Sequence, residues 1–409
     1  MSDPITALRF DELEGGVTAP GGFSAAGVAA GVKKSGRLDV ALLTADHAVP
    51  AAAVYTTNSV AAAPVVVSRS HTAHGHIRAA VVNSGNANAC TGPQGIADAG
   101  AMAEAVAESL GCTADEVVVS STGVIGVPLP LETVVRGITA AAAELAEDGG
   151  PRAAEAILTT DTFPKQCAVV CTVGGVDYTV GGMAKGSGMI QPNMATMLAF
   201  VTTDAPLTQA ACVQALSSAT ARTFNRITVD SDTSTNDMCL LMASGEAGGE
   251  PIGVPDARFA PVAAAIHHVC GELARMIVRD GEGATKFVEV TVRGAANEAD
   301  AELAAFAIAN SPLCKTAVFG GDANWGRVAM AIGKSGARVD PNAFDVVFAG
   351  IPTCLAGTGL AFDEEAAGAA LAKRDVDVLV DLHVGDAEAT VWTCDLSYEY
   401  VRINGEYRS

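Results

Sequence analysis

The sequence predicts a mixed α/β protein, and three features carry this prediction. Short apolar runs, most of them rich in valine, are typical of buried strands. Segments with helical spacing alternate with these runs, which favours helices layered on sheets. Hydrophobic residues make up 49% of the 409 residues and charged residues only 17%, so the chain can bury a large core. At about 150 residues per domain, this length predicts two or three folding units.

The predicted strands of the first half are apolar runs bounded by turn residues. They are Val40–Leu43, Ala79–Val82, Val117–Val119 and Ala168–Val173.

The predicted helices follow proline, glycine or capping residues and carry amphipathic or alanine-rich patterns. They are Gln94–Leu110, Leu131–Leu145, Thr208–Thr220, Asp256–Val278, Glu298–Ala309 and Glu364–Lys373.

The segment Gly181–Met194 is the most unusual interruption of this pattern. It reads GGMAKGSGMIQPNM, with four glycines and one proline, and it leads into the apolar run Met197–Val201. This composition indicates a strained or mobile approach to a buried strand. It also divides the chain almost in half.

Charge and cysteine content exclude several classes of protein. The formal net charge of −21 disfavours nucleic acid or an anionic membrane as a partner, which leaves small metabolites as the better expectation. We expect a cytoplasmic protein, because the first residues do not resemble a leader and no apolar run is long enough for a membrane helix. The ten cysteines, from Cys90 to Cys394, are spaced as reduced core thiols rather than as a disulfide framework or a zinc site.

The stretch KGSGMIQPNMATML, Lys185 to Leu198, resembles the cleavage motif of the ornithine acetyltransferase family. Further segments resemble the same family in order along nearly the whole chain. They are Thr18–Gly36, Tyr55–Val65, Val81–Gly92, Ser120–Gly126, Thr159–Lys165, Phe224–Asp237, Ser311–Arg327 and Tyr400–Ser409.

This resemblance implies a layered α-β-β-α sandwich of the ornithine acetyltransferase and DmpA-like type, with a smaller C-terminal subdomain. It also implies self-cleavage between Ala195 and Thr196. The products would be an alpha chain, 1–195, and a beta chain, 196–409, intertwined in one catalytic unit. Two copies of each chain would form a heterotetramer.

The resemblance further implies an enzyme of arginine biosynthesis that moves acetyl from N2-acetyl-L-ornithine to L-glutamate. The products would be L-ornithine and N-acetyl-L-glutamate. An N-terminal threonine can use its own α-amine, with a pKa of about 7.7–8.0, as the base that activates its hydroxyl. Thr196 would therefore carry the acetyl group as an ester, in ping-pong kinetics. No cofactor or metal is implied. The sequence leaves open whether acetyl-CoA is a second donor and whether the protein serves a specialised pathway.

By the same resemblance, the Thr122 hydroxyl and the Gly123 backbone N–H stabilise the oxyanion of each tetrahedral intermediate. Lys185 is the natural partner for the α-carboxylate that both amino-acid substrates share.

Other residues are placed around the substrate by resemblance alone. Glu282 could pair with an amine, while Thr159, Asn404 and Ser409 offer hydrogen bonds. Thr160 is nearly as plausible as its neighbour Thr159.

Three further patterns are interpreted as structural. The histidines of His71–His76 have no nearby carboxylate or cysteine to complete a metal site, which favours a solvated loop. Gly333–Ser335 lacks the earlier glycine of a phosphate loop, because Val328 stands there. The acidic stretch Asp230–Asp237 does not match a calcium loop and is expected to lie near the site.

Two alternative functions remain at this point. An aminopeptidase or amidohydrolase with an N-terminal nucleophile would use water in place of glutamate as the acceptor. A non-catalytic amino-acid-binding paralogue would stay a single 409-residue chain.

Overall fold

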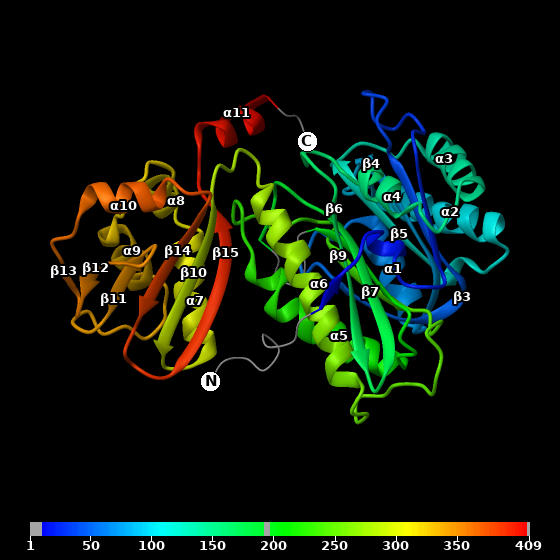
Figure 1. Ribbon diagram of the computed structural model, residues 1–409. Helices are drawn as coiled ribbons and strands as arrows, with labels where there is room; N and C mark the ends of the chain where they lie inside the picture. Colours follow the sequence, from blue (N-terminus) through cyan, green and yellow to red (C-terminus); the bar gives the residue numbers. More distant parts are fainter. Residues whose placement is uncertain (1–9, 192–196, 407–409) are drawn as a thin grey trace.

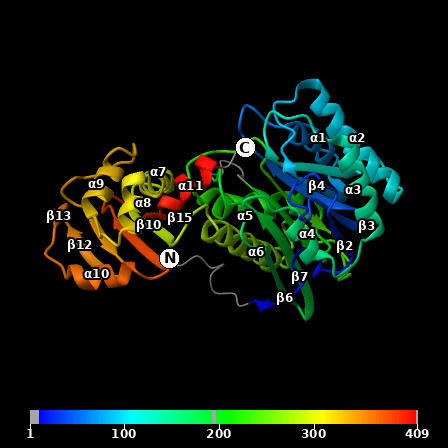
Figure 2. The same ribbon diagram turned by 90° about the horizontal axis from the view of Figure 1, so that it is seen from above.

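The computed structural model describes residues 10–191 and 197–406. It shows a larger unit, coloured blue to green in Figure 1, joined to a smaller unit coloured yellow to red. Figure 2 shows the same two units from above.

The larger unit is built on a nine-stranded sheet with the order β1-β6-β7-β8-β9-β3-β4-β5, and β2 pairs with β3 beside this path. The strands are β1 (Asp11–Glu12), β2 (Phe23–Val28), β3 (Val40–Tyr55), β4 (His76–Asn86), β5 (Val117–Val124), β6 (Lys165–Val173), β7 (Val176–Lys185), β8 (Leu198–Thr203) and β9 (Met238–Ala243).

The long strand β3 makes this sheet fold over into two layers. Its first part pairs with β2 and β4, and its last part, Ala51–Tyr55, pairs with β9. The register shifts between Thr44 and Val49, where β3 passes from one layer to the other.

Successive side chains of a strand point to opposite faces of its sheet, so the cores that they enter reveal the layers. On β8, Leu198 and Phe200 lie in the core between the two sheet layers, while Ala199 and Val201 face a second core with α5 and α6. On the other side, the outer face of β2 to β5 packs on α2 and α3. The larger unit is therefore an α-β-β-α sandwich, as expected from the sequence.

The helices of the sandwich are α1 (Ala63–Thr72), α2 (Gly92–Leu110), α3 (Leu131–Ala143), α4 (Gly150–Ala156), α5 (Gln209–Arg222) and α6 (Phe259–Arg279). Short 3-10 turns lie at Gly16–Thr18, Ala114–Glu116 and Phe224–Arg226.

Helix α6 illustrates why the sequence forms these layers. Its residues Val262, Ile266, Val269, Leu273 and Ile277 recur at helical spacing and are all fully buried. Burying each such side chain contributes about 1.5–3 kcal/mol, which holds α6 firmly against β6 and β7.

The smaller unit contains a six-stranded sheet with the order β13-β12-β11-β14-β10-β15. Its strands are β10 (Phe287–Ala295), β11 (Asp345–Phe348), β12 (Ile351–Leu355), β13 (Thr358–Gly359), β14 (Asp375–Asp381) and β15 (Ala387–Cys394). Its helices are α7 (Glu298–Ala309), α8 (Pro312–Phe319), α9 (Trp325–Gly333) and α10 (Glu364–Leu371), which share one apolar core with the sheet.

The last helix, α11 (Tyr398–Glu406), leaves the smaller unit and lies across the gap between the two units in Figure 1. The Tyr400 hydroxyl donates to the Asp230 carboxylate at 3.4 Å, and the Ser397 hydroxyl donates to the Gly283 carbonyl. These contacts bring the end of the chain back to the sandwich. No helix within the described ranges is long and apolar enough to cross a membrane.

The predicted elements are confirmed, but the strands run longer than expected, as in β3, which extends to Tyr55 instead of Leu43. Helix α7 has the predicted bounds, and α5 starts one residue late because Thr208 caps it by accepting from the Ala211 N–H. Helix α6 starts at Phe259 instead of Asp256. The loop predicted for His71–His76 is wrong in part: His71 lies in α1, where its Nδ1 bonds the Val117 carbonyl, and His76 opens β4.

Candidate active site

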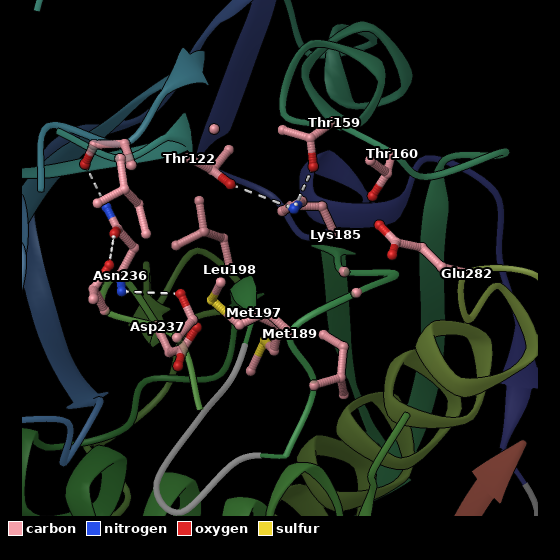
Figure 3. Close-up of a pocket in the computed structure, with 18 of the residues that line it drawn as sticks. Thr122, Thr159, Thr160, Lys185, Met189, Met197, Leu198, Asn236, Asp237 and Glu282 are labelled. Atoms are coloured by element: carbon pink, nitrogen blue, oxygen red, sulfur yellow. Dashed lines mark hydrogen bonds between the residues drawn. The ribbon is translucent and has the colours of Figure 1, made fainter. Parts of the chain in front are cut away.

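One pocket of the sandwich collects most of the residues that the sequence singled out (Figure 3). Its walls come from the end of β5, the turn after α4, the end of β7, the start of β8, the loop before β9, the turn after α6, and α11. The lining residues used below are Thr122, Gly123, Thr159, Thr160, Lys185, Met189, Met197, Asn236, Asp237, Glu282 and Asn404.

Glycine is required at position 123 by its backbone. The buried valines of β5 pair in parallel with β4, and this ladder becomes irregular around Gly85 and Asn86. There Gly123 has φ +135°, and a Cβ atom on it would lie 2.4 Å from the Gly85 carbonyl carbon. The turn that presents Thr122 and Gly123 to the pocket therefore depends on the missing side chain.

The Lys185 ammonium lies at the centre of one wall. It donates to the Thr159 hydroxyl at 2.8 Å and contacts the Thr122 hydroxyl at 3.4 Å, and Figure 3 shows both contacts. One carboxylate oxygen of Asp161 lies 3.7 Å from the same nitrogen. With its side chain only 10% exposed, Lys185 is a cation held in a fixed place.

Behind Lys185 lies a network of buried charges. The Lys165 ammonium donates to Asp161 at 2.7 Å and to Asp280 at 2.6 Å, and its side chain is fully buried. Asp161 also accepts from the backbone N–H groups of Thr159 and Gly186. Lys165 therefore ties the turn that carries Thr159 to the turn that leads to Glu282.

The charge of Asp161 is fixed by these neighbours. Burial alone would raise the pKa of Asp161, but the ammonium groups of Lys185 and Lys165 outweigh it and hold this pKa well below its usual range. The carboxylate stays ionised at neutral pH, so it stabilises both lysines as cations.

Glu282 and Asn404 also line the pocket. The Asn404 amide donates to a Glu282 carboxylate oxygen at 2.8 Å, and the Glu282 backbone N–H donates to the Ser187 carbonyl at 3.0 Å. The Ser187 hydroxyl in turn donates to the Asp280 carbonyl at 2.5 Å. A carboxylate therefore lies beside Thr160, on the same side of the pocket as Lys185 (Figure 3).

Asp237 brings a different carboxyl group to the pocket. It is 2% exposed, and its Oδ2 atom has no hydrogen-bond partner among the described residues. Burial raises the pKa of Asp237 well above its usual range, although Ser234, Lys185 and the Met197 N–H oppose the shift. A buried carboxyl group with a raised pKa therefore lies beside the start of β8.

The structure places six of the site residues predicted from the sequence around this pocket, and Thr160 also lines it. They are Thr122, Gly123, Thr159, Lys185, Glu282 and Asn404. The remaining three, Ala195, Thr196 and Ser409, lie outside the described residues.

The neighbours of the predicted cleavage site are nevertheless fixed. Lys185 and Leu198 are register partners in the antiparallel pair β7–β8, and Met197 also lines the pocket. The chain therefore enters and leaves the segment 186–197 at the pocket wall.

Sequence reasoning assigned no role to Asp161, Lys165 or Asp280, although two of them lie in a segment that resembles the family. Their partnership joins positions more than a hundred residues apart, so it has no local signal. The acidic loop was expected near the site, and Asp237 confirms this by lining the pocket.

No group of three or more histidine, cysteine, aspartate or glutamate residues with metal-site geometry occurs in the described part of the chain. Seven of the ten cysteines are buried and none forms a disulfide, while Cys90 is exposed. The pocket thus offers a cation, hydroxyl groups, a glycine turn, a buried carboxyl group and a half-buried carboxylate, which suits polar chemistry on a zwitterionic substrate.

Known proteins resemble this chain along nearly its whole length. A relative from Symbiobacterium thermophilum, the arginine biosynthesis bifunctional protein ArgJ, is 55% identical over 399 residues, covering 97% of this chain and 99% of its own. The crystal structure of the arginine biosynthesis bifunctional protein from Bacillus halodurans is 47% identical, with a TM-score of 0.51. It covers 52% of this chain and 100% of the solved chain.

A second solved structure is an ornithine acetyltransferase from Mycobacterium tuberculosis in complex with ornithine. It is 47% identical and covers 46% of this chain and 100% of the solved chain, with a TM-score of 0.44. The ArgJ family itself matches residues 24–409, which include the complete pocket described above. On this match, the chain belongs to the ArgJ family.

Proposed function

We propose that the protein is a glutamate N-acetyltransferase that moves acetyl from N2-acetyl-L-ornithine to L-glutamate. The observation that carries this proposal is that Lys185, the Thr122–Gly123 turn and Glu282 line one pocket. Family membership and the ornithine bound in one relative support the substrate class.

The pocket suits both substrates for an electrostatic reason. Their shared α-carboxylate can pair with the Lys185 ammonium, which already has hydroxyl neighbours that fix its position. The Glu282 carboxylate can accept the ammonium of ornithine, and the Asn404 amide orients that carboxylate. Thr159 and Thr160 both line the pocket, so either hydroxyl can reach a bound substrate.

The first step of the proposed mechanism is self-cleavage. The Thr196 hydroxyl oxygen attacks the carbonyl carbon of Ala195, the carbon–nitrogen bond breaks, and the proton ends on the released amine. Water then adds to the resulting ester, which restores the hydroxyl and leaves a carboxylate on Ala195. Chains 1–195 and 196–409 result.

Two observations support cleavage at this place. The homologous crystal structure from Bacillus halodurans aligns over its full length and still covers only 52% of this chain, close to the share that follows residue 195. In addition, Met189 has φ 58°, a left-handed conformation that costs roughly 1–2 kcal/mol in a residue other than glycine. Such strain in the approach favours a reaction that releases it.

The second step is acetyl transfer. The same hydroxyl attacks the acetyl carbonyl of acetylornithine while the α-amine of Thr196 takes its proton. Ornithine leaves with that proton, and glutamate then attacks the acetyl ester and restores the hydroxyl. The Thr122 hydroxyl and the Gly123 N–H would bind the oxyanion in both halves, and the nearby Lys185 ammonium would polarise Thr122 further.

The deciding experiment is an intact-mass measurement under denaturing conditions, before and after incubation with N-acetylornithine. We expect two fragments divided between Ala195 and Thr196, with one acetyl mass gained on the second. A single uncut chain that binds amino acids without transferring acetyl would contradict the proposal.

The variant Thr196→Ala is the matched control, because it removes the hydroxyl and little else. It should stay uncut and inactive, and cleavage or turnover in this variant would exclude Thr196 as the nucleophile. Omitting glutamate tests the hydrolase alternative, since a hydrolase would still release acetate. Replacing acetylornithine by acetyl-CoA tests whether there is a second donor.

A further inference from the structure

The three residues before the undescribed segment 192–196 are held by an unusually complete set of hydrogen bonds. Both carboxylate oxygens of Asp230 accept backbone N–H groups, that of Met189 at 2.6 Å and that of Ile190 at 2.8 Å. The Gln191 N–H donates to the Asp232 carbonyl at 2.8 Å. All three backbone donors are therefore satisfied by one loop.

The carbonyl groups of Ile190 and Gln191 accept hydrogen bonds from the same loop. The Ile190 carbonyl accepts from the Val229 N–H at 2.7 Å, and the Gln191 carbonyl accepts from the Thr233 hydroxyl at 2.9 Å. Ile190 and Thr233 also form an antiparallel bridge. Met189–Gln191 thus lies along the loop that leads to β9 and is joined to it by this isolated bridge.

One further contact comes from the smaller unit. The Asn310 amide, at the end of α7, donates to the Gln191 side-chain carbonyl at 2.8 Å. The side-chain oxygen of Asn310, Oδ1, accepts from the Thr228 hydroxyl at 2.7 Å, which fixes the orientation of the side-chain amide. Asn310 therefore touches both the loop and the residue at the edge of the segment.

The downstream edge of the segment is fixed as well. The Met238 N–H donates to the Met197 carbonyl at 2.9 Å, where β8 begins beside β9. Both ends of a five-residue connection are therefore anchored to residues that follow it in the chain. Reactions that need a near-attack geometry gain rate when the residues flanking the reacting bond are held in place.

We infer that Asp230, Asp232, Thr233 and Asn310 form a clamp that positions the chain for self-cleavage, and that Asn310 is the contact that the smaller unit supplies to this clamp. This inference rests on the proposed function, because it concerns the cleavage step. None of the four residues lines the pocket, so they act as positioning residues. Acetyl transfer by the finished enzyme should not need the Asn310 contact.

The test follows cleavage of the full-length chain made by cell-free synthesis, sampled over time on denaturing gels. Asn310→Ala and Gln191→Leu remove the same contact from opposite sides, and each should slow cleavage about fivefold or more, as expected for a lost hydrogen bond. The double variant should be no slower than either single variant. Asn310→Asp should cleave nearly as fast as the wild type, because its carboxylate can still accept from Thr228 and from a rotated Gln191 amide.

The matched control is Glu302→Gln, which weakens another contact between the two units, the Arg226–Glu302 ion pair at 2.6 Å, without touching Gln191. It should cleave at the wild-type rate. Once cut, the Asn310→Ala enzyme should have the wild-type kcat within about twofold and an unchanged melting temperature.

Wild-type cleavage rates in Asn310→Ala and Gln191→Leu would overturn the clamp while leaving the proposed function intact. Equal slowing in Glu302→Gln would also overturn it, because general docking would then explain the effect. A wild-type chain that never cuts would overturn the proposed function first and the clamp with it.

Discussion

The sandwich and the smaller unit use charge in opposite ways. In the sandwich, Lys165 joins Asp161 and Asp280 with all three side chains at most 2% exposed. In the smaller unit, ion pairs lie at the surface, as in Arg293–Asp381, where the arginine side chain is 53% exposed. Buried ion pairs contribute little net stability compared with apolar packing, so their presence marks a place where position matters more than stability.

Among the variants considered, replacing Lys165 should cause the largest loss of stability. Lys165→Met leaves two buried carboxylates without their cation and should lower the free energy of unfolding by about 3–5 kcal/mol. Arg293→Met in the smaller unit should change it by at most about 1 kcal/mol. Urea unfolding of both variants checks this prediction. Equal losses of unfolding free energy would show that the ion pairs of Lys165 and of Arg293 contribute alike.

The next largest effect concerns the turn that presents the proposed oxyanion donors, Thr122 and Gly123. Gly123→Ala places a Cβ atom against the Gly85 backbone and should lower kcat about 10²–10³-fold by moving the Gly123 N–H. Gly350→Ala in the smaller unit has a similar left-handed backbone, φ +83°, but open space around the new atom. It should leave kcat unchanged and cost about 1–2 kcal/mol of stability. An active Gly123→Ala enzyme would remove this turn from the mechanism.

The contribution of Asp237 to stability should depend on pH in the opposite sense to that of the ionised carboxylates. Its raised pKa means that the folded protein binds a proton that the unfolded chain releases, so this contribution to stability is complete below about pH 4 and is lost as pH rises through the folded pKa. Asp237→Asn mimics the protonated form. It should melt at a higher temperature than the wild type at pH 8 and at about the same temperature at pH 4, and a constant difference between the two pH values would refute the shift.

The smallest effect is expected where the smaller unit sends α11 to the pocket. Asn404→Ala removes one exposed hydrogen bond to Glu282 and should raise the KM for acetylornithine about two- to fivefold at unchanged kcat. Arg402→Ala on the same helix breaks only surface pairs with Glu399 and Glu406 and should change neither constant. Steady-state kinetics of both variants would reveal whether α11 contributes binding or only covers the site.

Local patterns made the layers of the sandwich predictable. The bounds of α7 follow from Asn297, whose side chain caps the helix, and the start of β8 follows from an apolar run after a glycine-rich stretch. The segment around His71 was misinterpreted because its polar residues hide the end of α1, which is held by contacts to the buried strand β5. Tertiary contacts, which the local sequence does not reveal, therefore determine where α1 ends.

The site was predictable only where a motif carried it. Resemblance placed Lys185 and Glu282 on a common substrate, and both line the pocket. The partnership of Lys165 with Asp280 could not be predicted, because no spacing rule connects residues 115 positions apart. Asn310 was missed for the same reason, since its contact with Gln191 exists only after the two units have met.

The strand order of the sandwich has a consequence for how such a protein can be made. Strands β8 and β9, from the part after residue 196, lie between β7 and β3, from the part before it. A gene divided at this position would yield two products, each with open strand edges that invite aggregation. Continuous synthesis brings both parts into one sheet before any division. If the chain cuts itself as proposed, the topology requires folding to come before cutting, and the amount of cut chain would then record how much of the protein had folded correctly.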